Sequence, residues 1–162
     1  MKINFTKKAK KQTPLSVKFK DETKVHPLLR DYFGYSLFKA SARLRSLMDQ
    51  SLAQHEMQSH HLGIIKLLQL KGSISQIQIG DELGIDKASM VKLIDQLEKE
   101  KYVSRQTDKK DRRIKNITLT AKGIKTIHQC DSLKTNVETQ FFSKLSPEEI
   151  TLLKRLMPLL LP

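Results

Sequence analysis

The chain has 162 residues, which is the size of one domain and enough for a hydrophobic core. Its 38% hydrophobic and 29% charged residues, with no Trp, fit a small helical globule and exclude a disordered chain. Thirty Lys and Arg against 17 Asp and Glu give a formal charge of +13. A polyanionic partner is therefore expected, and the alternative is a merely soluble basic protein.

The cysteine and apolar content bear on the compartment. A single cysteine, Cys130, excludes an internal disulfide and is typical of a reducing compartment. No stretch approaches the roughly 18 apolar residues that a membrane span needs. The lysines near the N-terminus precede no apolar signal segment. We therefore expect a cytoplasmic protein with no membrane partner.

Residues 1–26 form a basic arm with eight lysines, two acidic residues and little sustained periodicity. The pattern leaves the order of this arm open. One interpretation is that the arm adds nonspecific affinity for a polyanion. The alternative is that it is only a solvating extension.

Two helices are predicted after the arm. Pro27 favours the first turn of a long helix that continues from Leu28 to about Gln54. Ser59 is the expected N-cap of a second helix, which ends at Gly72. The long helix carries an apolar stripe that one small domain cannot bury completely, made of Leu29, Phe33, Leu37, Ala40, Leu44, Leu47 and Met48.

A helix, a glycine turn and a second helix follow, which is the pattern of a helix-turn-helix. Ser75 caps the short first helix, in which Gly80 allows close approach, and Gly84 supplies the turn. Asp86 caps the second helix, which continues to Glu100. One face of that helix is apolar at i, i+3, i+4, i+7 spacing, through Met90, Leu93, Ile94 and Leu97.

Two strands joined by a charged loop are expected next, and they form a β-wing. Alternation predicts the strands at 103–106 and 114–119. The loop is too charged for a core and suits a phosphate track or a minor groove. Six basic residues (Arg105, Lys109, Lys110, Arg112, Arg113, Lys115) stand against two acidic ones (Asp108, Asp111).

Two further helices are predicted near the C-terminus. Thr120 caps the first, which has Gly123 in its first turn. The second begins with a capping box between Ser146 and Glu149. The apolar residues 159–161 would form a sticky patch if exposed, so we expect them to pack on a partner chain.

The chain resembles the MarR (multiple antibiotic resistance regulator) family of winged helix-turn-helix transcription factors in the run D-E-L-G-I-D-K-A-S-M-V-K-L-I-D-Q-L-E-K-E-K-Y-V-S-R. The run is followed by D-K-K-D-R-R and L-T-A-K-G, and the resemblance covers about residues 27 to 161. The family usually has Gly after its recognition helix, where this chain has Lys101. If the left-handed conformation is kept, Lys101 is mildly strained.

The resemblance implies a mainly α fold with a small β-wing, in the α+β class. Residues 27–162 form a single MarR-type domain in this interpretation. Its winged-helix DNA-binding lobe spans residues 57–120, between dimerisation helices at 27–54 and 121–162. No cofactor and no metal are implied.

The resemblance also implies a sequence-specific regulator, usually a repressor, that acts on the bacterial nucleoid. It would bind double-stranded DNA as a homodimer, on a pseudo-palindromic operator with recognition helices about 10 bp apart. Binding of a small aromatic or anionic effector would release the DNA by changing the spacing of the two lobes. The crevice for that effector would be lined by Phe33, Leu37, Ala40, His60, His61 and Ile64.

Candidate DNA contacts come from the recognition helix and the wing. Lys87 and Ser89 are expected at base edges or phosphates, and Arg112 or Arg113 in a minor groove. In the family resemblance Asp111 orients an Arg rather than touching DNA. The full set is Ser75, Lys87, Ala88, Ser89, Val91, Lys92, Arg105, Lys109, Lys110, Asp111, Arg112 and Arg113.

Other functions are less well supported by the residues. Histidines 55, 60, 61 and 128 with Glu56 and Cys130 are metal-ligand types, but their spacing does not place them on one helix face. Cys130 as a peroxide switch competes with its more common role as a buried small hydrophobe. Phosphate loops, C-x-x-C, H-E-x-x-H and nucleophile-elbow motifs are absent, which argues against an enzyme. The remaining alternatives are a nonspecific or architectural nucleic-acid-binding protein and a metal-responsive member of the family.

Overall fold

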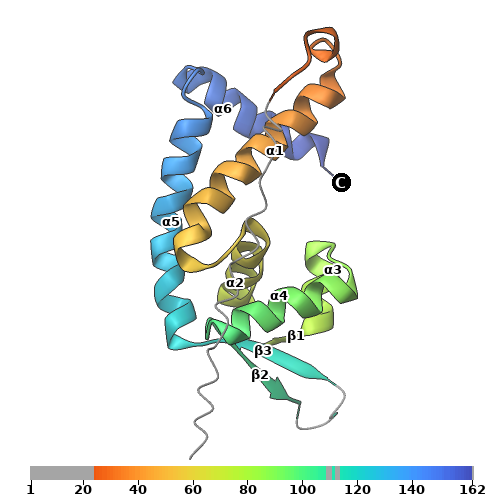
Figure 1. The fold of residues 1–162 in the computed structure, drawn as a ribbon, viewed down its shortest axis with the longest axis vertical. Helices are drawn as coiled ribbons and strands as arrows, with labels where there is room; N and C mark the ends of the chain where they lie inside the picture. The colour runs from red at the N-terminus through yellow and green to blue at the C-terminus, as the bar shows by residue number, and fades with distance from the viewer. Residues whose placement is uncertain (1–23, 109–110, 112–113, 162) are drawn as a thin grey trace, which may run out of the picture.

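The computed structural model describes residues 24–108, 111 and 114–161 (Figure 1). It confirms the predicted mainly helical fold with a small sheet, and the helices and strands occur in the predicted order. The elements are η1 (Pro27–Leu29), α1 (Phe33–Leu52), η2 (Ala53–His55), α2 (Ser59–Lys71), β1 (Ile74–Ser75), α3 (Gln76–Leu83), α4 (Lys87–Lys99), β2 (Val103–Thr107), β3 (Lys115–Leu119), α5 (Ala121–Phe141), α6 (Pro147–Leu156) and η3 (Met157–Leu160).

The molecule is elongated and has two parts, which are the upper and lower halves of Figure 1. The lower lobe contains α2, α3, α4 and the sheet, while α1 and α6 form the upper part. Helix α5 runs along one side from the sheet to α6 and so belongs to both. Among the described residues, no helix has the length and apolarity to cross a membrane.

A three-stranded antiparallel sheet with the order β1-β3-β2 forms the base of the lower lobe. Ile74 pairs with Ile117, and Val103 pairs with Leu119. The expected short strand at Ile74 is therefore present and extends the wing sheet. Because paired residues of an antiparallel ladder point to the same face, the register also determines which wing side chains face α4.

The core of the lower lobe is made where α2, α3 and α4 meet the sheet. Its fully buried members include Ile64 of α2, Ile79 of α3, Ile94 of α4 and Ile117 of β3, each 0% exposed. Ile127 of α5 joins the same cluster. The predicted periodicity of α4 is confirmed because Met90, Ile94 and Leu97 are buried.

Local hydrogen bonds explain the helix ends. The Ser75 hydroxyl accepts from the Gln78 N–H at 3.2 Å, and the Asp86 carboxylate accepts from the Ser89 N–H at 2.9 Å. A Cβ on Gly80 would lie 3.0 Å from the Ile85 carbonyl oxygen, so the predicted close approach is present. Gly84 ends α3 in the left-handed conformation, with φ of 62°.

Two further backbone positions set the angle of the wing. Lys101 has φ of 62°, so the left-handed turn after α4 is kept without glycine. A Cβ on Gly123 would collide with the Tyr102 carbonyl oxygen, and only glycine lets α5 pack against the end of the turn. Lys122 donates to the Glu100 carbonyl at 2.6 Å and lies over the Tyr102 ring, which strengthens the same junction.

The N-terminal helix begins later than the sequence predicts. Pro27 starts a single 3-10 turn, and the chain leaves helical conformation at Tyr32 before α1 begins at Phe33. The Ser36 hydroxyl donates to the Arg30 carbonyl at 3.0 Å, so the break is closed by a side chain rather than by continued helix.

The expected N-cap at Ser59 is wrong by one residue, because Gln58 is the N-cap of α2. The Ser59 backbone N–H and hydroxyl instead donate to the Asp49 carboxylate of α1, at 2.6 and 2.5 Å. Ser59 therefore joins α1 to α2. A further link leads from η2 to the end of α4, because the His55 carbonyl accepts from the Tyr102 hydroxyl at 2.9 Å.

Candidate nucleic-acid interface

The first turns of α4 present an exposed polar surface. Lys87, Ala88, Ser89 and Lys92 are all exposed, and Val91 is 38% exposed. They are held outward because the opposite face of the helix is buried in the core. Hydrogen bonds from the Ser89 side chain and then its backbone lower the pKa of Asp86. The Ser89 backbone N–H caps the helix on Asp86 at 2.9 Å, and the Ser89 side chain lies on the exposed face.

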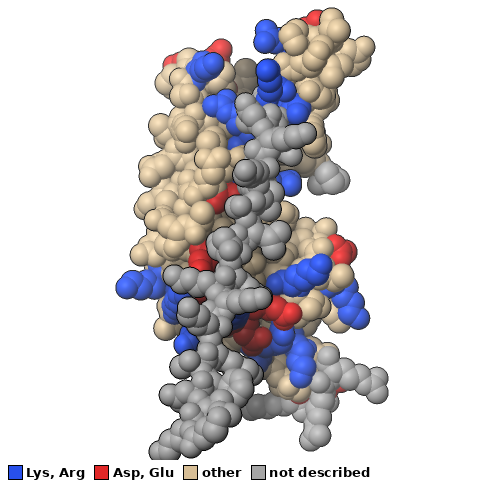
Figure 2. All heavy atoms as spheres, in the orientation of Figure 1, with Lys and Arg blue, Asp and Glu red and all other residues tan. Residues whose placement is uncertain are grey.

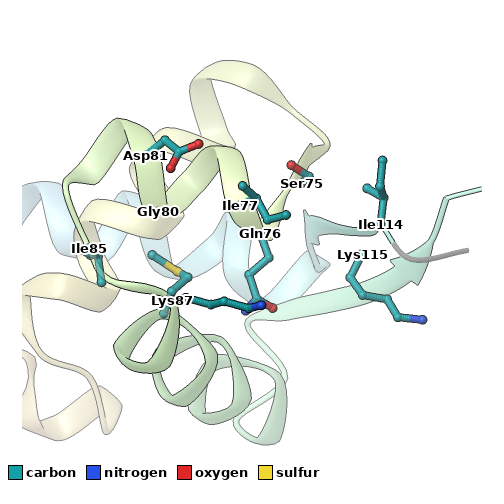
Figure 3. Close-up of a pocket in the computed structure, with 10 residues that line it drawn as sticks. Ser75, Gln76, Ile77, Gly80, Asp81, Ile85, Lys87, Ile114 and Lys115 are labelled. Carbon is teal, nitrogen blue, oxygen red and sulfur yellow. The ribbon is translucent and has the colours of Figure 1, made fainter. Parts of the chain in front are cut away.

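A groove of about 350 Å³ lies beside this surface, between the start of α3, the start of α4 and β3 (Figure 3). Ser75 and Lys87 were predicted at the interface, and both line it. Lys87 crosses the groove from the start of α4, and Lys115 lies at the edge formed by β3 (Figure 3). Its residues are Ser75, Gln76, Ile77, Gly80, Asp81, Ile85, Lys87, Met90, Ile114 and Lys115.

The other residues of the groove were not assigned to the interface from the sequence, and Gln76, Ile77 and Lys115 are the most informative of them. Gln76 and Ile77 follow the cap Ser75 directly, and Ile77 is 66% exposed although it is apolar. The signal available in the sequence was that Ile77 lies off the apolar face marked by Ile79 and Leu83. Lys115 belongs to the basic run of the wing but was not assigned to the interface; its ammonium donates to the Thr107 hydroxyl at 2.7 Å.

The wing is described only in part. Lys109, Lys110, Arg112 and Arg113, predicted as its DNA contacts, lie outside the described residues. Asp111 is exposed, and its backbone N–H donates to the Asp108 carboxylate at 3.1 Å. The other Asp108 oxygen accepts from the Asn116 amide at 2.9 Å. Asp108 therefore joins the two strands at the base of the wing loop.

Arg105, which was predicted to contact DNA, has internal partners in the structure. Its guanidinium lies 2.5 Å from Asp95 and 3.4 Å from Glu98, both on α4. The Arg105 side chain is 24% exposed. The sequence showed a basic residue in a basic stretch, but it did not show that two acids of the preceding helix lie beside it.

Several basic side chains of the lower lobe have no ion-pair partner in the part of the chain that the structure describes. Figure 2 shows Lys and Arg side chains over the lower lobe, with a second group in the upper half near α1 and α6. Lys87, Lys92 and Lys115 have no carboxylate partner among the described residues. Their charge is therefore available to a ligand, in contrast to that of Arg105.

A second crevice, of about 490 Å³, separates α1 from α2 and α3. Of the six residues expected in an effector crevice, only His60 lines it. His61 and Ile64 are buried in the core, Ala40 is half-buried, and Phe33 and Leu37 are exposed elsewhere. The crevice is lined by Ser41, Leu44, Arg45, Met48, Ser59, His60, Leu62, Gly63, Lys66, Leu83 and Ile85.

Two buried titratable groups, His61 and Cys130, have pKa values shifted toward their neutral forms. Burial first, and then the neighbouring His60, lower the pKa of His61 to about 4, while Asp49 acts in the opposite direction. Neutral His61 accepts from the Gln58 backbone N–H at 3.0 Å. Burial likewise raises the pKa of Cys130, which disfavours the reactive thiolate. Within the described residues, no three His, Cys, Asp or Glu side chains gather as a metal site.

Comparison with known proteins agrees with this geometry. Residues 59–115, which contain α2, α3, α4, β1 and β2, match the MarR family. This lobe is a MarR-family winged-helix domain. The predicted resemblance is thereby confirmed, and the MarR family consists of transcription regulators and not of enzymes.

Solved MarR-family structures extend the likeness to most of the chain. The apo form of MarR from E. coli has 18% identity and a TM-score of 0.71, over 86% of this chain and 99% of that one. A mutant MarR from E. coli in complex with operator DNA also has 18% identity, with a TM-score of 0.72, over 85% of this chain and 100% of that one. BpsR from Bordetella bronchiseptica, whose DNA binding is regulated by 6-hydroxynicotinic acid, has 21% identity and a TM-score of 0.71. The match covers 80% of this chain and 98% of that one. These likenesses show that the chain has the fold of MarR-family transcriptional regulators.

Proposed function

We propose that this chain is a sequence-specific DNA-binding repressor that acts as a homodimer and releases its operator when a small molecule binds. The exposed, unpaired cationic surface at the start of α4, beside the groove, is the observation that supports DNA binding most directly. Lys87 and Lys92 of α4 and Lys115 of β3 supply the charge. A recognition helix that enters the major groove by its N-terminal residues has this arrangement.

Individual roles follow from position. Lys87 donates to a phosphate or to guanine O6 and N7, and the exposed Ser89 hydroxyl bonds to a base edge or a phosphate. Exposed Val91 contacts a thymine methyl. The start of α3, at Ser75 and Gln76, lies along the phosphate backbone, where backbone N–H groups favour an anion.

Dimerisation is supported by apolar surface in the upper part of the molecule. Tyr32, Phe33 and Phe38 at the start of α1 are 66, 72 and 65% exposed. Leu159, Leu160 and Leu161 at the C-terminus are 77, 61 and 66% exposed. Exposed apolar patches of this kind mark protein interfaces. A two-fold dimer through these ends presents two recognition helices to successive major grooves, hence a pseudo-palindromic operator.

The crevice between α1 and the lower lobe is the proposed effector site. Arg45 and His60 are exposed at its edge, and its walls are apolar through Leu44, Met48 and Leu83. The Arg45 guanidinium beside an apolar cleft suits a small aromatic or aliphatic anion. A ligand that fits the crevice in only one spacing of the two lobes shifts the DNA-binding equilibrium by its difference in affinity.

The test is a salt-dependent titration of the full chain against the intergenic DNA beside its own gene. A scrambled duplex of equal length is the control. We expect the native duplex to bind about a hundredfold more tightly or better, with one dimer bound. Equal and steeply salt-dependent affinity for both duplexes would contradict specific regulation and favour nonspecific, architectural binding.

A further inference from the structure

We infer that Arg105 is a positioning residue for DNA recognition, which fixes the wing against the recognition helix by bridging Asp95 and Glu98. This role rests on the proposed function, because it matters only if α4 and the wing contact one duplex together. It differs from a direct phosphate contact, the role that a basic residue in a wing would ordinarily be given.

The sheet register places Arg105 on the inner face of the wing. Arg105 pairs with Ile117, which is 0% exposed, and Val103, two residues earlier, is 2% exposed. Cross-strand partners and alternate residues share a face. The Arg105 side chain therefore starts from the face that covers α4, whereas the neighbouring Gln106 lies on the other face and is exposed.

The recognition helix supplies the partners that a cation on this face needs. Val91, Asp95 and Glu98 follow each other at i, i+4, i+7, so both acids lie on the flank that begins at Val91. The Arg105 guanidinium lies 2.5 Å from Asp95 and 3.4 Å from Glu98. The planar fork of arginine suits two carboxylates at once, which a lysine ammonium does not match.

Glu98 also holds the backbone of the wing. Its Oε1 accepts from the Arg105 N–H at 3.2 Å. Acids of α4 therefore bind both the main chain and the side chain of Arg105 in β2. The Arg105 Nε is buried and has no hydrogen-bond partner among the described residues. The guanidinium is thus turned toward the protein and not toward a phosphate.

The three side chains have a second consequence for charge. Without Arg105, two carboxylates would remain unpaired on a flank of the helix that is proposed to enter DNA. Arg105 offsets one of their two negative charges, so the cations Lys87 and Lys92 outweigh the single negative charge left on this flank. Loss of Arg105 would therefore lower operator affinity through both positioning and charge. Loss of Glu98 would lower it through positioning alone, against the electrostatic effect.

The decisive variant is Glu98→Gln, measured by operator titration over a range of salt. It removes a negative charge from the DNA-binding lobe, so electrostatics alone would strengthen binding. We expect operator affinity to fall about tenfold, a coupling typical of neighbouring charged groups, with the slope of log Kobs against log salt unchanged. Arg105→Lys should lose affinity in the same way, because one ammonium cannot bridge both acids.

Glu56→Gln is the matched control, since Glu56 is an exposed acid beside the end of α4 that does not line the groove and has no ion-pair partner among the described residues. It changes the charge equally and leaves the bridge intact, so affinity should stay constant or rise. The inference is overturned if Glu98→Gln binds the operator as tightly as the unaltered chain or more tightly. It is equally overturned if Arg105→Lys keeps full affinity while Arg105→Gln lowers the salt slope by about 0.9, the signature of a phosphate contact.

A readout without DNA separates this inference from the proposed function. In Glu98→Ala the Arg105 amide loses its acceptor, so its hydrogen exchange should accelerate while the Ile94 amide in the middle of α4 stays protected. Unchanged exchange at Arg105 would overturn the bridge even if the operator is bound. Failure of the unaltered chain to prefer the operator would instead contradict the proposed function and leave the exchange result to decide the bridge.

Discussion

The lower lobe and the upper end of this molecule differ in how completely each buries its own apolar residues. Helices α2, α3 and α4 contribute nine buried residues, four, two and three respectively. Helix α6 and η3 contribute none, and α1 only Leu52 at its last position. The lobe therefore has a buried core to which α1 and α5 also contribute, while the upper end leaves many of its apolar residues exposed. We infer that DNA contact and assembly are divided between the two parts.

The largest effect is expected where the upper end lacks a core. Leu160→Asp combined with Leu161→Asp should convert the proposed dimer to a monomer, because charge would be buried in an apolar interface. Light scattering coupled to size exclusion measures the change. Leu70→Asp is the matched control, since Leu70 is 80% exposed but lies at the end of α2. A double variant that stays dimeric would contradict the proposal that the exposed apolar residues of the upper end form the dimer interface.

The next effect concerns the core of the lobe and its pH dependence. Folded His61 has a pKa of about 4 against 6.5 for the unfolded group, so the unfolded state binds more protons between these values. The stabilising effect of neutral His61 is complete above pH 6.5 and is lost as the pH falls toward 4. We expect a loss of about 2 kcal/mol in the free energy of unfolding between pH 7 and pH 5.

Denaturant titrations at both pH values measure this loss. His61→Phe should flatten the dependence, whereas His60→Gln should reduce it only in part, because burial is the larger cause of the lowered His61 pKa. An unaltered pH dependence in His61→Phe would mean that other groups cause it. The buried His61 would then contribute little to the pH dependence of the free energy of unfolding.

A smaller effect is expected at the DNA-reading surface of the lobe. Lys87→Ala should lower the slope of log Kobs against log salt by about 0.9 if one phosphate contact is lost. Lys125→Ala removes the same charge from exposed α5 and should leave the slope unchanged. Equal slopes in the two variants would contradict the assignment of the interface to α4.

The smallest effect is expected at the left-handed turn between α4 and the wing. Lys101→Gly should stabilise the protein by about 1 kcal/mol, because only glycine adopts positive φ without steric cost. Lys99→Gly, two residues earlier within α4, should instead destabilise it by about 1 kcal/mol. Thermal melts of both variants test the sign. Loss of stability in Lys101→Gly would show that Lys101 makes contacts worth more than the strain.

Most of the elements were predictable because their signals are local. The caps at Ser75, Asp86, Thr120 and Ser146 form hydrogen bonds three residues along the chain. Errors arose where a distant residue competed for a local group. The hydroxyl of Ser59 bonds to Asp49 instead of capping its own helix, and nothing near Ser59 in the sequence indicates this.

The candidate site was predicted less completely than the fold. Exposed residues of α4 followed from its periodicity, since the buried face determines the opposite one. The effector crevice did not, because its walls come from α1, α2 and α3, whose relative placement depends on packing. His61 and Ile64 were expected in the crevice but are core residues. Which face of α2 packs into the core depends on its placement against the other helices.

The sequence by itself determined the order and type of most elements and the basic character of the interface. These depend on periodicity, capping and charge, which act over a few residues. Only the tertiary structure decided the direction of Arg105, because its register with Ile117 and its partners on α4 depend on how the sheet meets the helix. A cation in the sequence attracts phosphate and carboxylate alike, and the fold determines which of them it meets.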